Sequence, residues 1–162
     1  MRELWLMRHG AAEATSSGGD DERPLTPAGE LTSRRVGLAL ARMGLAPDEV
    51  WHSPFRRAQQ TAAAVAAQLG GCELVPQDTM TPHGHASAVC ELLFAARARR
   101  LLLVSHLPLL PAVVSELLAA PLRIDLSPSS VVELLILGGT SARGSCALGG
   151  FFRADQLVAL IG

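Results

Sequence analysis

The residues best suited to chemistry are Arg8, His9 and Gly10, which follow directly on the apolar run Leu4-Trp5-Leu6-Met7. A run of four apolar residues is short for a helix and is typical of a strand buried on both faces of a parallel sheet. The cation and the imidazole would then stand at the carboxyl end of that strand, where open α/β sheets bind ligands. Gly10 lets the chain turn sharply there. Taken alone, the triplet fits an ordinary surface turn equally well.

A second imidazole stands in the same kind of position later in the chain. The run Leu101-Leu102-Leu103-Val104 is the strongest strand pattern and leads into Ser105, His106 and Leu107-Pro108. Pro111 would remove an early helical hydrogen bond, so we expect the regular part of the next helix to start nearer Pro111 than Pro108. The sequence therefore predicts a histidine at a second strand end, just before a helix.

A pair of arginines falls at a predicted helix start. Small and apolar residues at steps of three and four predict a helix from about 54 to 69, with Ser53 as its cap. Arg56 and Arg57 then lie in the first turn, where the helix dipole disfavours cations. Two guanidinium groups there make sense if an anion is bound as well. The alternative is a solvated basic pair.

The remaining elements are those that must position these residues. Thr26 and Pro27 predict a helix start, and Ala28, Leu31, Val36, Leu40 and Met43 give its apolar face, with Gly44 as a stop. The preceding stretch 11–23 is a loop without periodicity, which we interpret either as a lid over the site or as an ordinary surface loop.

Further patterns complete an α/β protein. Short strands are expected at 49–52 and 73–75, a helix at 86–98 with Arg97, Arg99 and Arg100 near its end, and a marginal helix at 153–161. Strands at 131–137 and 146–152 flank the loop 138–144 and predict a hairpin. We therefore expect a single domain, residues 1–162: a three-layer sandwich with a mostly parallel sheet, helices on both faces and a C-terminal antiparallel hairpin.

Composition excludes several classes of function. A formal charge of −1 gives no reason to expect a nucleic-acid or membrane surface, and charged residues interrupt the 49% hydrophobic content well short of a bilayer span. The N-terminal stretch is too short for a signal-peptide core, so we expect a cytoplasmic protein. His83 and His85 resemble a metal pair, but the three widely spaced cysteines and the nearby carboxylates do not complete metal-ligand spacing. We predict neither a metal nor a cofactor.

In their order and context, four motifs resemble those of the histidine phosphatase superfamily, also called the phosphoglycerate-mutase-like family. They are Arg8-His9-Gly10, Pro24-Leu25-Thr26 with Gly29, Ser53-Pro54 with Arg57-Ala58 and Gln60-Thr61, and Ser105-His106. The short length, the Thr81-Pro82 loop and the sequence from Val104 to Pro108 are most similar to small bacterial phosphohistidine phosphatases of the SixA type.

The resemblance implies a role for each of these residues. His9 would be the nucleophile, Arg8 and Arg57 would hold the phosphate, and His106 would be a second imidazole touching the phosphoryl oxygens; Arg56 falls on a variable position. Phosphoryl transfer needs in-line positioning and charge stabilisation, which two arginines and a protonated His106 can supply without magnesium. His9 must be neutral, with its other ring nitrogen bonded to a carbonyl near Gly10.

The departure from the family concerns the general acid. Small members carry an acidic residue after Thr-Pro-x-Gly, where this sequence has His85. An alkyl phosphate needs a proton for its leaving group far more than a phosphoramidate does. We therefore expect phosphohistidine on a protein as the substrate, with His83 or His85 as a possible donor. The alternatives are a phosphatase for small phosphoesters, and a phosphate- or phosphoprotein-binding module without turnover.

Overall fold

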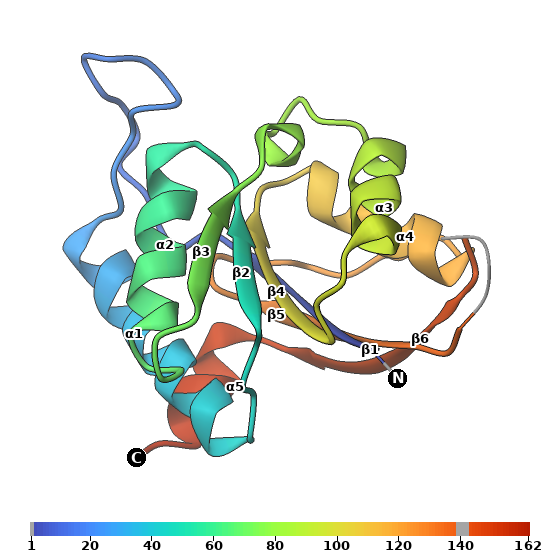
Figure 1. Ribbon diagram of the computed structural model, residues 1–162. Coiled ribbons are helices and arrows are strands. Elements are labelled where there is room, and N and C mark those ends of the chain that lie inside the picture. Colours follow the sequence, from blue (N-terminus) through green and yellow to red (C-terminus); the bar gives the residue numbers. More distant parts are fainter. Residues whose placement is uncertain (1, 139–142) are drawn as a thin grey trace.

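The computed structural model describes residues 2–138 and 143–162, which form three layers around one mixed sheet (Figure 1). The order of its strands is β3-β2-β4-β1-β5-β6. The strands are β1 Arg2–Arg8, β2 Glu49–His52, β3 Glu73–Pro76, β4 Arg100–Ser105, β5 Val131–Ile136 and β6 Cys146–Phe152. The helices are α1 Pro27–Arg42, α2 Arg56–Ala66, the 3₁₀ turn η1 Asp78–Met80, α3 Ala86–Ala95, α4 Leu109–Leu118 and α5 Ala154–Ala159.

Two apolar clusters divide the helices between the faces of the sheet (Figure 1). Trp5 and Met7 of β1 pack with α1, α2 and α5, whereas Leu4 and Leu6 pack with α3 and α4. Successive side chains of a strand point to opposite faces, so an uninterrupted apolar run is what a doubly covered strand requires. The predicted three-layer α/β architecture is confirmed.

The sheet is parallel at one end and antiparallel at the other. β1, β2, β3 and β4 pair in parallel, and β5 joins β1 and β6 in antiparallel pairing. The C-terminal hairpin is therefore confirmed, although residues 139–142 of its predicted loop lie outside the described part of the chain. The mostly parallel pairing brings the carboxyl ends of β1, β2 and β4 to one edge.

The predicted apolar face of α1 is partly wrong. Val36 and Leu40 are buried, but Ala28, Leu31 and Met43 are exposed. The buried face consists instead of small residues among the apolar ones, namely Gly29, Ser33, Gly37 and Ala39. A Cβ on Gly37 would lie 2.9 Å from the Val65 Cα of α2, so the two helices approach too closely for larger side chains. Close packing through small residues cannot be predicted from hydrophobic periodicity.

Several predicted helix ends also need correction. α2 begins at Arg56 with Phe55 as its N-cap, so Ser53 is not the cap, although its Oγ accepts a hydrogen bond from the Phe55 N–H. α3 ends at Ala95, and Arg100 already belongs to β4. The residues Arg97, Arg99 and Arg100 therefore lie beyond the last turn that they were expected to stabilise.

The N-terminal ends of α1 and α4 show where a helix tolerates proline. α4 begins at Leu109, earlier than expected, because Pro111 falls in its first turn, where no intrahelical N–H bond is needed. At α1 the predicted cap is confirmed: the Gly29 N–H donates to Thr26 Oγ1 over 3.0 Å, and Pro27 is the first helical residue.

Candidate active site

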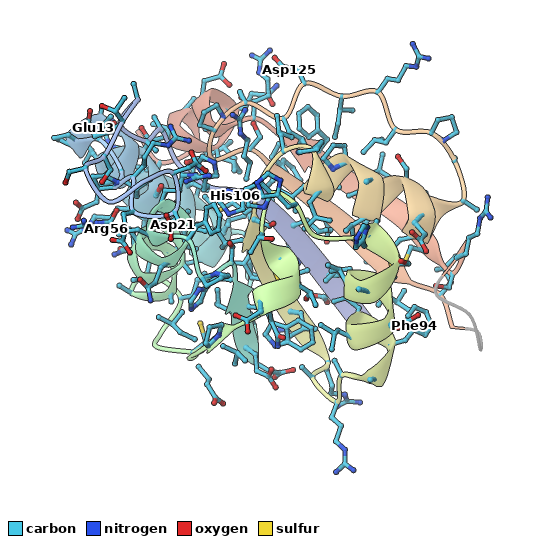
Figure 2. The ribbon with its side chains drawn as sticks, turned by 90° about the horizontal axis from the view of Figure 1, so that it is seen from above. Glu13, Asp21, Arg56, Phe94, His106 and Asp125 are labelled. Atoms are coloured by element: carbon cyan, nitrogen blue, oxygen red, sulfur yellow. The ribbon has the colours of Figure 1, made fainter. Side chains whose placement is uncertain are left out.

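The register of the sheet brings the two strand-end histidines together. β1 and β4 pair so that Arg8 stands opposite Ser105, and His9 and His106 follow immediately. Their ring centroids are 4.9 Å apart with the planes tilted by 55°. Figure 2 looks down on this edge of the sheet and shows His106 above the strand ends. The sequence-predicted residues Arg8, His9, Arg57 and His106 all line one hollow there.

Backbone hydrogen bonding fixes the tautomer of His9. Its Nδ1 lies 2.7 Å from the carbonyl oxygen of Gly10. A carbonyl only accepts, so Nδ1 carries the proton and Nε2 keeps its lone pair. The Arg57 Nε–H donates to Nε2 over 3.3 Å, which requires the same tautomer. The predicted contact with a carbonyl near Gly10 is therefore present.

Burial keeps His9 neutral. Desolvation lowers the pKa of His9 to about 4; the Gly10 hydrogen bond opposes this shift, and the charges of Arg57 and Arg8 add to it. Since the usual value for histidine is near 6.5, the ring is uncharged near neutral pH. The structure thus presents a neutral imidazole whose Nε2 lone pair faces the guanidinium of Arg57, an arrangement that suits nucleophilic attack on an anion once that guanidinium turns to the anion's oxygens.

His106 differs from the expected protonated residue. It is 1% exposed, and neither of its ring nitrogens has a hydrogen-bond partner among the described residues. Burial and the neighbouring His9 and Arg57 lower the pKa of His106 to about 3, so its imidazole is neutral in the protein alone. A phosphoryl dianion beside it would favour the charged form. The positive charge expected on His106 would therefore require a bound anion.

The two arginines of α2 are placed in opposite environments. Arg57 is 3% exposed, and its guanidinium lies over the Phe55 ring, with Cζ 4.9 Å from the centroid. Arg56 is exposed and lies at the side of the site in Figure 2. Arg57 is therefore the guanidinium of this pair that reaches the hollow, and Arg56 belongs to the surface.

Arg8 reaches the hollow from the other side. Its NH1 group donates to the Leu126 carbonyl over 2.7 Å, which holds the side chain against the segment before β5. Its Nε is buried without a hydrogen-bond partner among the described residues. A buried donor of this kind needs an acceptor, and a phosphoryl oxygen in the hollow would supply one.

The loop 11–23 is docked on α2 rather than loose. The Arg57 NH1 group donates to the backbone carbonyl of Asp20, and its NH2 group donates to Asp20 Oδ2 over 3.1 Å. The Arg56 N–H donates to the Asp21 carbonyl over 2.8 Å. Since α2 has no side-chain cap in the described structure, this loop carbonyl satisfies one of its free N–H groups.

Asp20 and Arg23 are site residues that sequence reasoning missed. Both line the hollow, and Arg23 Nε donates to Asp20 Oδ1 over 2.7 Å. Partial burial alone would raise the pKa of Asp20, but hydrogen bonds from Arg57 and Arg23 lower it, so the carboxylate stays ionised. A spacing of three residues hints at the pair with Arg23. No local signal reveals the contact with Arg57, which is 37 residues away.

The remaining motif residues support the loop that follows His9. The Gly10 N–H donates to Thr61 Oγ1 over 3.0 Å, and Thr61 Oγ1 donates to the Arg57 carbonyl over 2.7 Å. A Cβ on Gly29 would lie 2.1 Å from the Ala11 oxygen, so only glycine allows α1 to approach this loop. Thr61 and Gly29 therefore act on the backbone around His9.

The hollow has a volume of about 480 Å³ and opens at the sheet edge. Its lining comprises Arg8, His9, Gly10, Ala11, Ala12, Asp20, Arg23, Arg57, Pro82, His83, His106, Leu107 and Pro128. His83 is in this lining, whereas His85 is the N-cap residue of α3. Within residues 2–138 and 143–162, no group of three or more His, Cys, Asp or Glu side chains is arranged to hold a metal ion.

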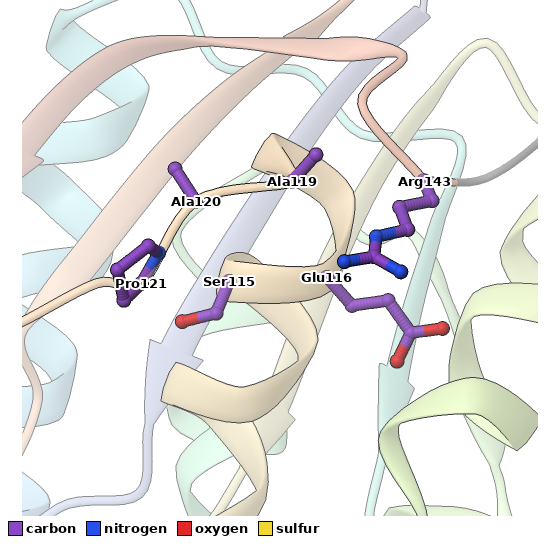
Figure 3. A pocket seen from close by; sticks show the side chains of 6 residues that line it. All are labelled: Ser115, Glu116, Ala119, Ala120, Pro121 and Arg143. Atoms are coloured by element: carbon purple, nitrogen blue, oxygen red, sulfur yellow. The ribbon is translucent and has the colours of Figure 1, made fainter.

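A second hollow of about 460 Å³ lies at the C-terminal end of α4 (Figure 3). It is lined by Ser115, Glu116, Ala119, Ala120, Pro121 and Arg143. The two hollows are similar in size but differ in chemistry, because only the first of them combines two histidines with three arginines. None of the described helices is both long and apolar enough to span a bilayer.

Comparison with known proteins identifies relatives of the whole arrangement. Residues 4–81 match the model of the histidine phosphatase superfamily (branch 1). The chain is 31% identical to a phosphohistidine phosphatase SixA homolog of Haemophilus influenzae over 150 residues, which cover 85% of this chain and 90% of that protein. It is 35% identical to phosphohistidine phosphatase SixA of Escherichia coli over 121 residues, covering 71% and 73% of the two chains.

A solved structure extends the likeness to the fold. The protein histidine phosphatase SixA complexed with tungstate superposes with a TM-score of 0.85 at 27% identity, covering 96% of this chain and 99% of that one.

Proposed function

Because this chain belongs to the histidine phosphatase superfamily (branch 1), we propose that it removes the phosphoryl group from phosphohistidine on a protein through a covalent phospho-His9 intermediate. The observation that carries the proposal is the pairing of a fixed lone pair on His9 Nε2 with a guanidinium donor 3.3 Å away. An incoming phosphoryl group at that position meets a nucleophile and a cation together.

The first step follows from the charges of the site. His9 Nε2 attacks phosphorus while Arg57 and Arg8 stabilise the equatorial oxygens, whose charge is spread in a loose transition state. The bound dianion raises the proton affinity of His106, which then contributes a further hydrogen bond. Two guanidinium groups and an imidazole supply the charge that a metal ion supplies in other phosphatases.

The second step returns the enzyme to its starting state. Water attacks the phosphorus of phospho-His9, the P–N bond breaks, and its electron pair returns to Nε2 as the lone pair. The Gly10 carbonyl holds Nδ1–H throughout, so the ring emerges in the tautomer with which it began. Splitting hydrolysis into two displacements is covalent catalysis and produces ping-pong kinetics.

Phosphohistidine is favoured by the state of the carboxylate in the lining. Asp20 is held ionised by Arg57 and Arg23 and is therefore a poor proton donor to an alkoxide. An imidazole leaving group makes a smaller demand for a proton. The names of the two curated relatives and of the tungstate complex point in the same direction.

A small phosphomonoester is the second candidate. A hollow of about 480 Å³ is within the range of small-molecule sites, and it opens at the sheet edge without a long covering segment. A phosphate- or phosphoprotein-binding module without turnover is the third. The three candidates can be separated by measuring turnover and phosphate binding with the same set of substrates.

The test is phosphate release from a phosphohistidine peptide and from para-nitrophenyl phosphate, in the presence of EDTA, by the intact protein and by His9→Ala. We expect His9-dependent turnover that is much faster on the peptide. Faster ester turnover would establish the second candidate. Binding of phosphate without turnover on either substrate would establish the third.

A single-turnover experiment tests the intermediate itself. Radiolabelled phosphohistidine peptide should transfer its label to the intact protein as an acid-labile, alkali-stable adduct, as expected of an N-phosphoryl bond. The adduct should be absent from His9→Ala. Labelling that persists without His9 would contradict the proposed nucleophile.

A further inference from the structure

The two histidines of the loop between β3 and α3 occupy different places, although one residue separates them. Both are exposed. His83 lines the hollow together with Pro82 and Leu107, in the same lining as His9, Arg57 and His106. His85 caps α3 through its backbone, since the Val89 N–H approaches its carbonyl oxygen. Only one of the two candidate donors is therefore at the site.

A tight turn holds His83 in place. The Gly84 N–H donates to the Thr81 carbonyl over 3.0 Å, which makes Pro82 and His83 the central residues of a β-turn. Proline fixes φ at the first central position. A Cβ on Gly84 would lie 2.0 Å from the Thr79 oxygen, so the turn is pressed against η1. The backbone of His83 is thus confined on both sides.

The base of this turn is tied to the strand that carries His106. Ser105 Oγ donates to the Met80 carbonyl over 2.7 Å, and Met80 is buried. Ser105 immediately precedes His106, and Met80 lies three residues before His83. One hydrogen bond therefore fixes the position of the His83 turn relative to the phosphate-facing imidazole.

The other ionisable groups of the described lining are unsuited to donate a proton. Arginine does not release its proton in proteins, and this applies to Arg8, Arg23 and Arg57. Asp20 is ionised, and His9 is the neutral attacking group. His106 is neutral in the protein alone, and the proton that it gains beside the bound dianion is donated to the phosphoryl oxygens rather than to the leaving group. In an in-line displacement the leaving group departs on the side of phosphorus opposite His9. His83 is an exposed residue of the same lining and carries a titratable side chain.

From this placement, and resting on the proposed function, we infer that His83 is the general acid and base of the reaction. In the first step the His9 Nε2–P bond forms and the bond from phosphorus to the leaving nitrogen breaks. His83 gives its proton to that nitrogen, which departs as neutral imidazole. In the second step neutral His83 takes a proton from the attacking water, and hydrogen phosphate leaves. His83 is then protonated again.

The experiment compares two substrates that differ by one N-methyl group on the leaving ring. The ring of N-phosphoimidazole departs as imidazolate unless one of its nitrogens receives a proton, so kcat/KM is measured at a pH where its second nitrogen is unprotonated. The ring of the N-methylated analogue carries a fixed positive charge and departs as neutral N-methylimidazole without a proton. We measure kcat/KM for both with the intact protein, His83→Gln and the matched control His85→Gln.

We expect His83→Gln to lower kcat/KM for N-phosphoimidazole by about 10- to 100-fold, within the range of general acid catalysis, and to leave the N-methylated substrate close to the intact protein. His85→Gln should match the intact protein on both. Equal losses on the two substrates, no loss on either, or the same loss in His85→Gln would overturn the assignment of His83.

A His9→Ala control separates this inference from the proposed function. If turnover of both substrates persists in His9→Ala, the phospho-His9 mechanism fails, and the role of His83 fails with it. If turnover depends on His9 but the two substrates respond equally to His83→Gln, only the role of His83 is wrong.

Discussion

Two buried histidines stand at the ends of strands on either side of β4, with the same hydrogen bond and different surroundings. His9 follows β1 and places Nδ1 2.7 Å from the carbonyl of the next residue, Gly10. His52 ends β2 and places Nδ1 2.9 Å from the carbonyl of the next residue, Ser53. Both are at least nine-tenths buried. The local conformation that fixes a tautomer is therefore found twice.

The two histidines differ in whether their rings reach the hollow, and in the case of His9 Nε2 also has a charged neighbour. That neighbour is the guanidinium of Arg57, with Arg8 and His106 in the same lining. His52 is absent from that lining, and its backbone carbonyl serves the loop after β3 by accepting a hydrogen bond from Gln77. A fixed tautomer is thus insufficient for a nucleophile, which also needs cations and access to substrate.

The largest expected effect tests this contrast directly. His9→Gln should lower turnover of a phosphohistidine peptide by roughly 10³-fold or more, because the attacking nitrogen is lost. His52→Gln should retain turnover close to that of the intact protein. Steady-state kinetics on both variants, with circular dichroism to establish folding, checks the prediction. If His52→Gln folds but is inactive, the distinction drawn between His9 and His52 is wrong.

The next effect concerns the cations around His9. Arg57→Lys should lower kcat/KM by about 100-fold, because an ammonium group cannot contact both His9 and Asp20 as the planar guanidinium does. Arg56→Lys, one residue away and exposed, is the matched control and should leave kcat/KM unchanged. Similar losses of kcat/KM in the two variants would mean that the planar guanidinium of Arg57 makes no specific contribution to kcat/KM.

The smallest expected effect is on the way in which the free energy of unfolding depends on pH. The folded pKa of His9 is about 4, below the usual 6.5, so the unfolded chain binds the proton more readily, and stability is lost as pH falls below 6.5. By pH 5 the loss should be about 2 kcal/mol for this group. Urea unfolding at several pH values should show a smaller loss in His9→Gln. An identical loss would indicate that His9 is not held neutral.

Sequence reasoning was most successful where chemistry and strand position coincide. An apolar run that ends in a polar residue is visible in the sequence at Met7-Arg8 and at Val104-Ser105. Parallel pairing of β1 with β4 then places both strand ends at the same edge of the sheet. The structure also places Arg57, and not Arg56, in the lining of the hollow, and it shows the expected contact of His9 Nδ1 with the Gly10 carbonyl.

The features that were missed depend on tertiary approach. The contact of Asp20 with Arg57 exists because a loop without periodicity folds back on α2. The buried face of α1 is set by how closely α2 and the loop after His9 approach, which favours glycine and serine over leucine. The choice between His83 and His85 depended on the lining of the hollow, which includes His83 and not His85. None of these distances is encoded by local periodicity.

The shared use of Arg57 has a consequence for engineering. The same guanidinium that faces His9 also holds Asp20, so loop composition and chemical rate are coupled through one side chain. A library that varies residues 14–19 while keeping Asp20 and Arg23 changes the exposed part of the loop and leaves the anchor of Arg57 intact. Under the proposed function, such a library tests whether the choice of substrate protein can be changed without changing the chemical rate.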